Sequence, residues 1–188
     1  GNEWVVNGSK IFITNASTRI TSGVTALCRT GTREDGRPEL SCILVESGTP
    51  GFEAREMHGK LMWRASNTSE LYFDDCRVPQ ENLLGPRGHG FYQMLQTLDG
   101  GRLSIGAMGL GGAQGCLDLS LKYSKEREQF GKPISNFQVN AFKLADMALE
   151  IECARLILYK ACWLRDNNKP FSKEAAMAKL HCSEVMYR

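Results

Sequence analysis

The spacing of apolar residues changes once along the chain, near residue 87. Before that point, short segments such as VTALCRTG and SELYFDDCRVP alternate between apolar and polar positions, with turn residues between them. After it, apolar residues recur at steps of three and four over long segments. A period of two is typical of strands and a period near 3.6 is typical of helices. The pattern therefore predicts a β domain over residues 1–87 and a helical domain over residues 88–188.

The β half contains two candidate hairpins. In WVVNGSKIFITN, apolar residues flank Asn7-Gly8, a dipeptide that favours a two-residue turn. Further along, VTALCRTG and LSCILVES flank a charged loop that contains Asp35-Gly36, and a later strand ends at Pro79. Short strands with regular turn signals predict an antiparallel β-barrel or sandwich.

The helical half begins with one long or kinked helix from about residue 90. Ser135 and Asn136 are candidate N-caps of a second helix, and Ser172 is the candidate N-cap of a third. The predicted fold class is therefore α+β, an antiparallel barrel or sandwich followed by an up-down helical bundle. The strand pattern at the start and the unfinished amphipathic pattern at Arg188 predict that both ends are cuts through a larger protein.

Glycines recur on the first predicted helix. They do not form a dinucleotide-binding fingerprint, because the spacing is wrong and a helix precedes them. Each glycine costs a helix about 1 kcal/mol relative to alanine, so we expect a compensating close approach of another backbone. A neighbouring helix is the favoured interpretation and a bound ligand the alternative. The glycines concerned are Gly106, Gly109, Gly111, Gly112 and Gly115.

Composition narrows the possible functions. Apolar residues make up 42% of the 188 positions and charged residues 23%, as in folded globular proteins. A net charge of +2 is too small for nucleic-acid binding by bulk electrostatics. We expect no membrane span and no signal peptide, because no apolar run is long enough and the chain opens on polar, strand-like sequence. The seven cysteines lack C-x-x-C spacing, so we interpret them as buried thiols in a reducing compartment and predict no metal site.

One polar segment carries candidate chemistry. In YSKEREQFGKPISNFQ, Arg127, Gln129 and Phe130 fall between two helical patterns, where a helical hairpin would have its tip. An arginine, an amide and an aromatic ring suit a ligand that carries a phosphate and a ring. They also suit a solvated turn, which these residues by themselves favour.

Five stretches, taken together, resemble the acyl-CoA dehydrogenase family: KIFITNA, DDCRVPQENLLG, GFYQMLQTLDGGR, REQFGKPISNFQ and FKLADMALEIECARL. They occur in the order and spacing of that family, and the ending DNNKPFSKEAAMAKLHCSE is most similar to the short-chain (butyryl-CoA) members. The resemblance implies a chain made of most of a middle β domain and the first helices of a C-terminal bundle. No single motif is decisive, but the resemblance extends over essentially all residues.

The resemblance implies an FAD-dependent reaction. A carboxylate removes the α-proton of an acyl-CoA thioester, the β-hydrogen passes to the flavin as hydride, and a trans-2-enoyl-CoA forms. In most members the glutamate base lies near the C-terminus, which here is beyond Arg188. A minority place it where this chain has Gly101. We therefore expect no catalytic base among these residues.

The resemblance also assigns cofactor-binding positions. One segment matches residues that pack against the isoalloxazine ring, although as residues alone they suit a core aromatic and a strand hydroxyl. The hairpin tip and the start of the next helix match residues that hold the pyrophosphate and adenosine end of the FAD of a neighbouring subunit. Such sharing implies a homo-oligomer, usually a tetramer. The positions are Phe12, Ile13, Thr14, Arg127, Gln129, Phe130, Phe137 and Gln138.

Substrate contacts are implied on the first helix and one loop. Asp99 and Arg102 match a D-x-x-R pattern that contacts the acyl-CoA and supports the base, although a surface ion pair is the alternative. Bulky residues one or two turns earlier are expected to line a modest acyl pocket: Met94, Leu95 and Leu98. The loop at residues 30–37, with Arg33 and Arg37, lies roughly where relatives meet the nucleotide end of CoA.

The resemblance further implies partners and leaves alternatives open. Electrons would pass to an electron-transferring flavoprotein, in a bacterial cytoplasm or a mitochondrial matrix. An acyl-CoA oxidase, which hands electrons to oxygen, is an alternative of the same fold. A flavin-binding scaffold that has lost catalysis is the alternative of a different class.

Overall fold

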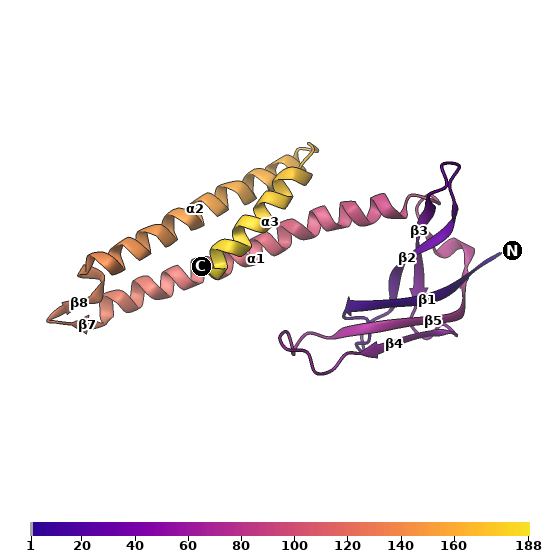
Figure 1. Ribbon diagram of the computed structural model, residues 1–188, viewed down its shortest axis with the longest axis horizontal. Coiled ribbons are helices and arrows are strands. Elements are labelled where there is room, and N and C mark those ends of the chain that lie inside the picture. Colours follow the sequence, from indigo (N-terminus) through magenta and orange to yellow (C-terminus); the bar gives the residue numbers. More distant parts are fainter. Residues whose placement is uncertain (1) are drawn as a thin grey trace. The chain divides into compact units, whose positions relative to one another are not determined.

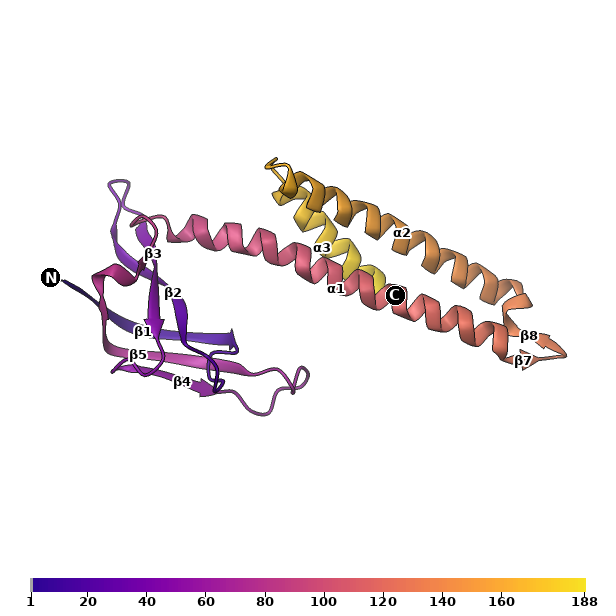
Figure 2. The ribbon, with the colours of Figure 1, turned by 180° about the vertical axis from the view of Figure 1, so that it is seen from behind.

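The computed structural model describes residues 2–188 and divides the chain into two compact units, Gly1–Leu95 and Gln96–Arg188. The first unit is built of strands and the second of helices (Figures 1 and 2), which confirms the α+β class. The division falls within helix α1, and the domain boundary near residue 87 stays a prediction.

The first unit contains two antiparallel sheets. One has the strand order β1-β5-β4 and the other β2-β3-β6. Within residues 2–95 the strands do not close into a barrel, so of the two predicted architectures the sandwich is the one observed. The strands are β1 (Glu3–Thr14), β2 (Gly23–Thr32), β3 (Pro38–Glu46), β4 (Phe52–Glu56), β5 (Thr68–Pro79) and β6 (Leu83–Leu84).

A common core joins the two sheets. Phe73 of β5 is buried and stacks on Phe52 of β4, with ring centroids 5.0 Å apart. Ile43 and Val45 of β3 are each only 1% exposed and belong to the same cluster. Alternation along each strand places these residues on the inner faces, as the period of two predicts.

The predicted hairpin at Asn7-Gly8 is wrong. Strand β1 continues through these residues and pairs with β5 over its whole length. Between the pairs Val6–Cys76 and Gly8–Phe73, the single residue Asn7 lies opposite Asp74 and Asp75, which is a β-bulge on β5. The Asn7 side-chain amide accepts from the Asp75 backbone N–H at 2.7 Å and donates to the Asp75 carboxylate at 3.0 Å. Asn7, a residue type that favours turns, therefore provides the hydrogen-bond partner of the backbone N–H that the bulge leaves outside the strand pairing.

The predicted hairpin across the charged loop is present. Strands β2 and β3 pair from Gly23–Glu46 to Thr32–Pro38. Helix α1 starts against this hairpin, because a Cβ on Gly90 would lie 2.6 Å from the backbone carbon of Ser41. The Gly88 N–H also donates to the Ser41 hydroxyl at 2.9 Å. The first residues of α1 thus belong to the β unit.

The second unit is an antiparallel arrangement of three helices. Helix α1 (Gly90–Glu126) is unbroken over 37 residues, α2 (Gln138–Asp166) returns alongside it, and α3 (Ser172–Tyr187) runs back again. A two-stranded turn, β7 (Glu128–Gln129) and β8 (Lys132–Pro133), separates α1 from α2. The up-down order agrees with the prediction, and one core cluster joins all three helices.

The glycine stripe on α1 packs against α3. A Cβ on Gly109 would lie 2.8 Å from the Cys182 backbone oxygen, and one on Gly106 would lie 3.5 Å from the Ala178 backbone oxygen. The expected helix-to-helix contact is thus confirmed for this face. Gly111 and Gly115 differ, because a Cβ at either position would meet nothing within 4 Å.

The predicted helix caps are wrong in detail. Ser135 and Asn136 lie in a short 3-10 turn (Ile134–Asn136), and α2 has Phe137 as its N-cap without a side-chain cap. Ser172 is the first residue of α3, after the N-cap Phe171, and its hydroxyl donates to Asp99 of α1. The Ser172 hydroxyl therefore bonds to a side chain of α1, whereas the hydroxyl of a capping serine would accept from a backbone N–H of its own helix.

The cysteines are only partly buried, although all seven are free thiols. Burial raises the pKa of the Cys42, Cys76 and Cys182 thiols, which agrees with the interpretation as inert core residues. Cys116 and Cys153 are exposed on α1 and α2, so the prediction of burial is wrong for these two.

Candidate functional site

A second β-bulge displays Phe12 at the end of β1. Between the pairs Lys10–Leu71 and Ile13–Ser69, Ile11 and Phe12 together lie opposite one residue of β5. Phe12 has a φ of 62°, a left-handed conformation that is uncommon for a bulky residue, and the residue is 68% exposed. The bulge turns the aromatic ring out of the core. The sequence predicted the residue but not the backbone conformation.

A cavity of about 460 Å³ lies beside the residues that follow Phe12. Ile13 and Thr14 of β1 contribute to its wall, as does Met94 from the start of α1. The structure thus brings together, within the first unit, two residues predicted for the flavin and one predicted for the acyl pocket. Ile13 is half-buried and Thr14 is exposed, so the hydroxyl is accessible to a ligand.

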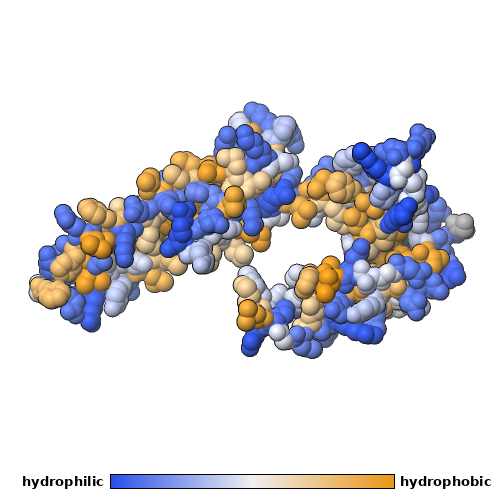
Figure 3. Space-filling view, in the orientation of Figure 1, coloured by the Kyte–Doolittle hydropathy of each residue, from blue (hydrophilic) through white to orange (hydrophobic). Residues whose placement is uncertain are grey.

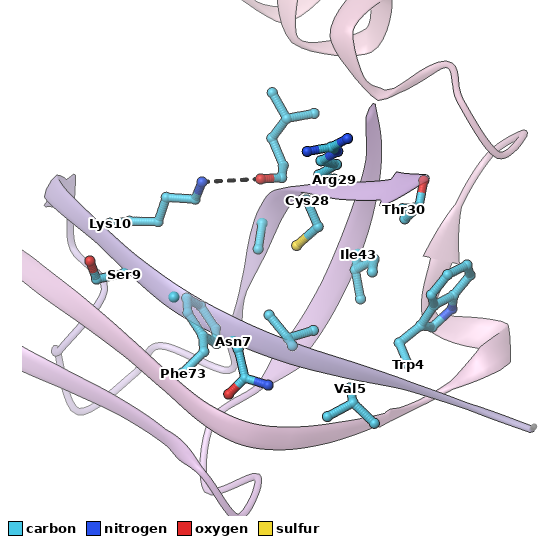
Figure 4. A pocket seen from close by; sticks show the side chains of 14 residues that line it. Trp4, Val5, Asn7, Ser9, Lys10, Cys28, Arg29, Thr30, Ile43 and Phe73 are labelled. Carbon is cyan, nitrogen blue, oxygen red and sulfur yellow. Dashed lines mark hydrogen bonds between the residues drawn. The ribbon is translucent and has the colours of Figure 1, made fainter. Parts of the chain in front are cut away.

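A separate cavity of about 320 Å³ lies between β1 and the β2–β3 hairpin (Figure 4). Lys10 reaches across it, and its Nζ donates to the Leu27 backbone oxygen at 3.1 Å. Cys28 also lines this cavity. Burial raises the pKa of its thiol, and the Lys10 ammonium offsets part of that rise. The Lys10 contact ties β1 to β2 across the two sheets.

The tip of the helical hairpin presents aromatic and cationic groups. Phe130 has a φ of 53° and is 91% exposed, and its ring meets that of Phe137 edge to face at 6.1 Å. Lys132 Nζ lies 4.5 Å from the Phe137 ring centroid. Within residues 2–188, the Arg127 guanidinium has no hydrogen-bond or ion-pair partner. An exposed ring beside unpaired donors is chemically suited to a ring that carries phosphates.

The backbone fixes this tip while its polar side chains stay exposed. The Ile134 N–H donates to the Arg127 carbonyl at 2.8 Å and closes the turn. Gln129 pairs with Lys132 in the short ladder, and Gln138 is the first residue of α2. Both glutamine side chains are exposed. Backbone hydrogen bonds therefore close the turn, and its amide and guanidinium groups stay exposed to a ligand.

The predicted substrate residues of α1 form an ion pair. Arg102 Nη1 donates to Asp99 Oδ1 at 2.5 Å, with the Asp99 side chain 15% exposed and that of Arg102 39% exposed. Leu98 is 54% exposed beside them. The carboxylate end of this pair is half-buried and its guanidinium end is exposed, so a substrate contact and a surface ion pair both stay predictions. Gly101 is exposed, with open space where a side chain would begin.

The loop predicted for the CoA nucleotide shapes a small cavity with α1. Arg33, Arg37, Phe91 and Tyr92 line about 260 Å³. Arg33 is held by a hydrogen bond from its Nη2 to the Gly88 backbone oxygen at 2.8 Å. Sequence reasoning missed the aromatic pair, although two adjacent aromatics at a helix start were a visible signal.

A polar network under this loop was also missed. Arg87 Nε donates to Glu39 at 2.6 Å, and the Thr30 hydroxyl donates to the same carboxylate at 2.8 Å. These two hydrogen bonds hold the pKa of the Glu39 carboxyl below its usual range, and the bond from Arg87 has the larger effect. Arg87 also lies 5.7 Å from the Trp4 ring centroid. The network ties the segment before α1 to the β2–β3 hairpin.

No three histidine, cysteine, aspartate or glutamate side chains within residues 2–188 are grouped so that they could hold a metal ion. In the same residues, no helix combines the length and apolarity needed to cross a membrane.

Comparison with family models first gives the class. Residues 1–76 match the acyl-CoA dehydrogenase middle domain, and residues 88–188 match the acyl-CoA dehydrogenase C-terminal domain. The chain belongs to the acyl-CoA dehydrogenase family, and the resemblance in its sequence is confirmed.

Individual relatives agree with this assignment. The chain is 53% identical to a probable acyl-CoA dehydrogenase, YngJ, of Bacillus subtilis. The alignment extends over 188 residues, which are all of the chain and 49% of that protein. The chain is similar to butyryl-CoA dehydrogenase from Megasphaera elsdenii, with a TM-score of 0.88 and 42% identity over 97% of the chain and 47% of that structure. A chain in a structure of the electron transferring flavoprotein of Acidaminococcus fermentans is 45% identical, with a TM-score of 0.87 over 98% of the chain and 48% of that chain. The chain spans about half the length of the curated relatives it matches.

Proposed function

We propose that the full-length protein is an FAD-dependent acyl-CoA dehydrogenase that converts short-chain acyl-CoA thioesters into trans-2-enoyl-CoA products. The observation that carries this proposal is the match of both halves of the chain to the two family domains. The similarity to butyryl-CoA dehydrogenase supports a short-chain substrate. The domain division at residues 87 and 88 is part of the same proposal.

FAD, when bound, supplies the hydride acceptor for the reaction. The residues present fit its two ends. Phe12 offers an exposed aromatic face, and Thr14 offers a hydroxyl that can hydrogen-bond a ring nitrogen, with Ile13 between them. At the hairpin tip, Arg127 offers an unpaired fork for phosphate oxygens, Gln129 and Gln138 offer amides, and Phe130 and Phe137 offer rings.

We propose that the tip serves the FAD of a neighbouring copy, so that the protein is a homo-oligomer and, by family resemblance, a tetramer. Apolar side chains on the visible face of the helical unit (Figure 3) support association. Several large ones are more than half exposed, namely Leu119, Val139, Phe142, Leu149 and Leu156.

The acyl-CoA would contact α1 and the loop between β2 and β3. Asp99 and Arg102 orient the thioester end, and Met94, Leu95 and Leu98 limit the acyl chain. Arg33 and Arg37, with the adjacent aromatic pair, would hold the phosphate and adenine of CoA, because guanidinium groups bind phosphates and aromatic rings stack on bases.

The chain's own contribution to the proton transfer is indirect. Arg102 and Asp99 are a partly buried, opposite-charge pair that can fix donors near the substrate. The base itself is expected beyond Arg188, since Gly101 carries no carboxylate. We propose an electron-transferring flavoprotein as acceptor, which the similarity to a chain from such a structure supports. The compartment, bacterial cytoplasm or mitochondrial matrix, stays a prediction.

The test is to purify the full-length protein and measure both flavin and turnover. We expect about one FAD per subunit and reduction of the flavin by butyryl-CoA under anaerobic conditions. Reoxidation by an electron-transferring flavoprotein should be much faster than reoxidation by air, whereas the opposite order supports the oxidase. Full flavin content without any reduction by acyl-CoA supports the scaffold. Colourless protein that does not take up added FAD contradicts the proposal as a whole.

A second measurement addresses chain length. We expect the highest kcat/KM with acyl groups of about four to six carbons, because longer chains must displace packed side chains at a cost of roughly 1–3 kcal/mol. Leu98→Ala should raise kcat/KM for octanoyl-CoA relative to butyryl-CoA. An optimum at about twelve carbons in the unaltered protein contradicts the assignment of these residues to the acyl pocket.

A further inference from the structure

The Asp99 carboxylate is held by two helices at once. One oxygen, Oδ1, accepts from Arg102, three residues further along α1, at 2.5 Å. The other oxygen, Oδ2, accepts from the hydroxyl of Ser172, which begins α3. Because the donors bind different oxygens, they fix both the position and the plane of the carboxylate.

The start of α3 is itself held in place. Phe171 packs against the core of the helical unit, and Glu174 pairs with Lys160 of α2 at 3.6 Å. Further along α3, the Cys182 backbone lies against Gly109 of α1. Ser172 therefore presents its hydroxyl from a fixed position.

The surroundings of the Asp99 carboxylate strengthen the effect of its hydrogen bond with Ser172. The Asp99 side chain is 15% exposed, so its carboxylate meets little water although Ser172 itself is exposed. The carboxylate also lies at the N-terminal end of α3, where the helix dipole favours a negative charge. The Asp99–Arg102 pair alone holds only one of the two carboxylate oxygens.

We infer that Ser172 is a positioning residue for the acyl-CoA site, acting through Asp99 on Arg102. The inference rests on the proposed function, in which Asp99 and Arg102 contact the substrate. It adds a residue outside the D-x-x-R segment and makes α3 part of the substrate site. A hydroxyl at this position holds the ion pair in the orientation in which it meets the thioester.

The experiment uses the full-length protein with FAD bound and compares three substitutions at one position. Ser172→Ala removes the hydroxyl, and we expect KM for butyryl-CoA to rise about three- to tenfold with a smaller change in kcat. Ser172→Thr keeps the hydroxyl and should return KM to near the original value. Flavin content and Tm of Ser172→Ala and Ser172→Thr should differ little from the unaltered protein, because Ser172 is exposed and caps no backbone group.

Ser172→Asp separates positioning from helix stability. An acidic residue in the first turn of a helix is favourable, so a serine that only stabilises α3 predicts unchanged or higher Tm and unchanged KM. A positioning serine predicts a larger rise in KM than Ser172→Ala, because two carboxylates would face each other. Ser183→Ala is the matched control, since that hydroxyl donates within α3 to the Lys179 carbonyl at 2.7 Å.

The outcomes distinguish this inference from the function on which it rests. If the unaltered protein neither binds nor oxidises acyl-CoA, the proposed function is wrong and the inference falls with it. If the unaltered protein is active but Ser172→Ala and Ser172→Asp keep its KM, the inference alone is overturned. Failure of Ser172→Thr to restore KM also overturns it, because the hydroxyl would then not be the acting group.

Discussion

Replacing Gly109 by alanine should destabilise the helical unit, although alanine is the better helix former. The intrinsic gain is about 1 kcal/mol. Against it, the new Cβ would lie 2.8 Å from the Cys182 backbone oxygen and 3.0 Å from the Cys182 backbone carbon. Backbone atoms cannot rotate away, so α1 and α3 must separate. Overpacking of this kind costs roughly 1–3 kcal/mol, and contact with backbone puts it at the upper end. We expect a net loss of about 1–2 kcal/mol.

Two other glycines of the same helix provide controls with different expected results. A Cβ on Gly115 meets nothing within 4 Å, so Gly115→Ala should stabilise the protein by up to about 1 kcal/mol. A Cβ on Gly112 meets the flexible end of Met186 at 2.7 Å. Because methionine can change rotamer, Gly112→Ala should be nearly neutral.

Urea unfolding of the full-length protein, followed by circular dichroism with FAD in excess, measures these differences. The slope m should stay constant across the series, so that shifts in midpoint report free energy. Gly109→Ala and Gly115→Ala should differ by about 2–3 kcal/mol, with opposite signs relative to the unaltered protein. If Gly109→Ala is as stabilising as Gly115→Ala, the close approach of α3 to α1 is not a constraint and the reasoning fails.

Two further predictions concern charged groups. Arg127→Ala should lower FAD content and weaken the oligomer together, by about 1.5–3 kcal/mol in FAD binding, whereas Lys125→Ala, on the same charged segment, should be nearly silent; FAD content and sedimentation at matched concentration measure both, and full flavin with intact assembly in Arg127→Ala refutes the role of the tip. The pKa of Glu39 is lowered in the folded state by Arg87 and Thr30, so its stabilisation is present above the unfolded pKa and is lost as pH falls through the folded pKa. Glu39→Gln should therefore be less stable than the unaltered protein at neutral pH, and the gap in Tm should close below about pH 4; a gap that persists at acidic pH contradicts this.

Periodicity predicted the two halves of this chain because each half has one buried face. Phe73 and Ile43 alternate inward from their strands, and the stripe through Gly109 marks where a helix must approach closely. Such signals are local and repeat along the sequence. The resemblance to the family then predicted which exposed residues carry chemistry, which periodicity by itself leaves open.

Errors arose where one residue type serves two structures. Asn7-Gly8 favours a turn, yet the partner strand supplied a bulge whose backbone the Asn7 side chain satisfies. Ser172 has the right type and place for an N-cap, yet its hydroxyl donates to Asp99, 73 residues away in sequence. In both cases the side chain bonds to a residue distant in sequence, and the expected local hydrogen bond does not form. Sequence patterns do not contain the position of a distant partner, so they do not predict these hydrogen bonds.

The two bulges between β1 and β5 have a consequence for how such sequences vary in length. One bulge adds a residue to β5 at Asp74–Asp75, and the other adds a residue to β1 at Ile11–Phe12. Because they lie on opposite strands, the second restores the pairing frame that the first shifts. Losing one alone would turn every side chain beyond it to the opposite face. Single-residue deletions in these two paired strands are therefore expected to occur together, one in each strand. A homologue that lacks both bulges would keep its core but would lose the backbone conformation that exposes Phe12.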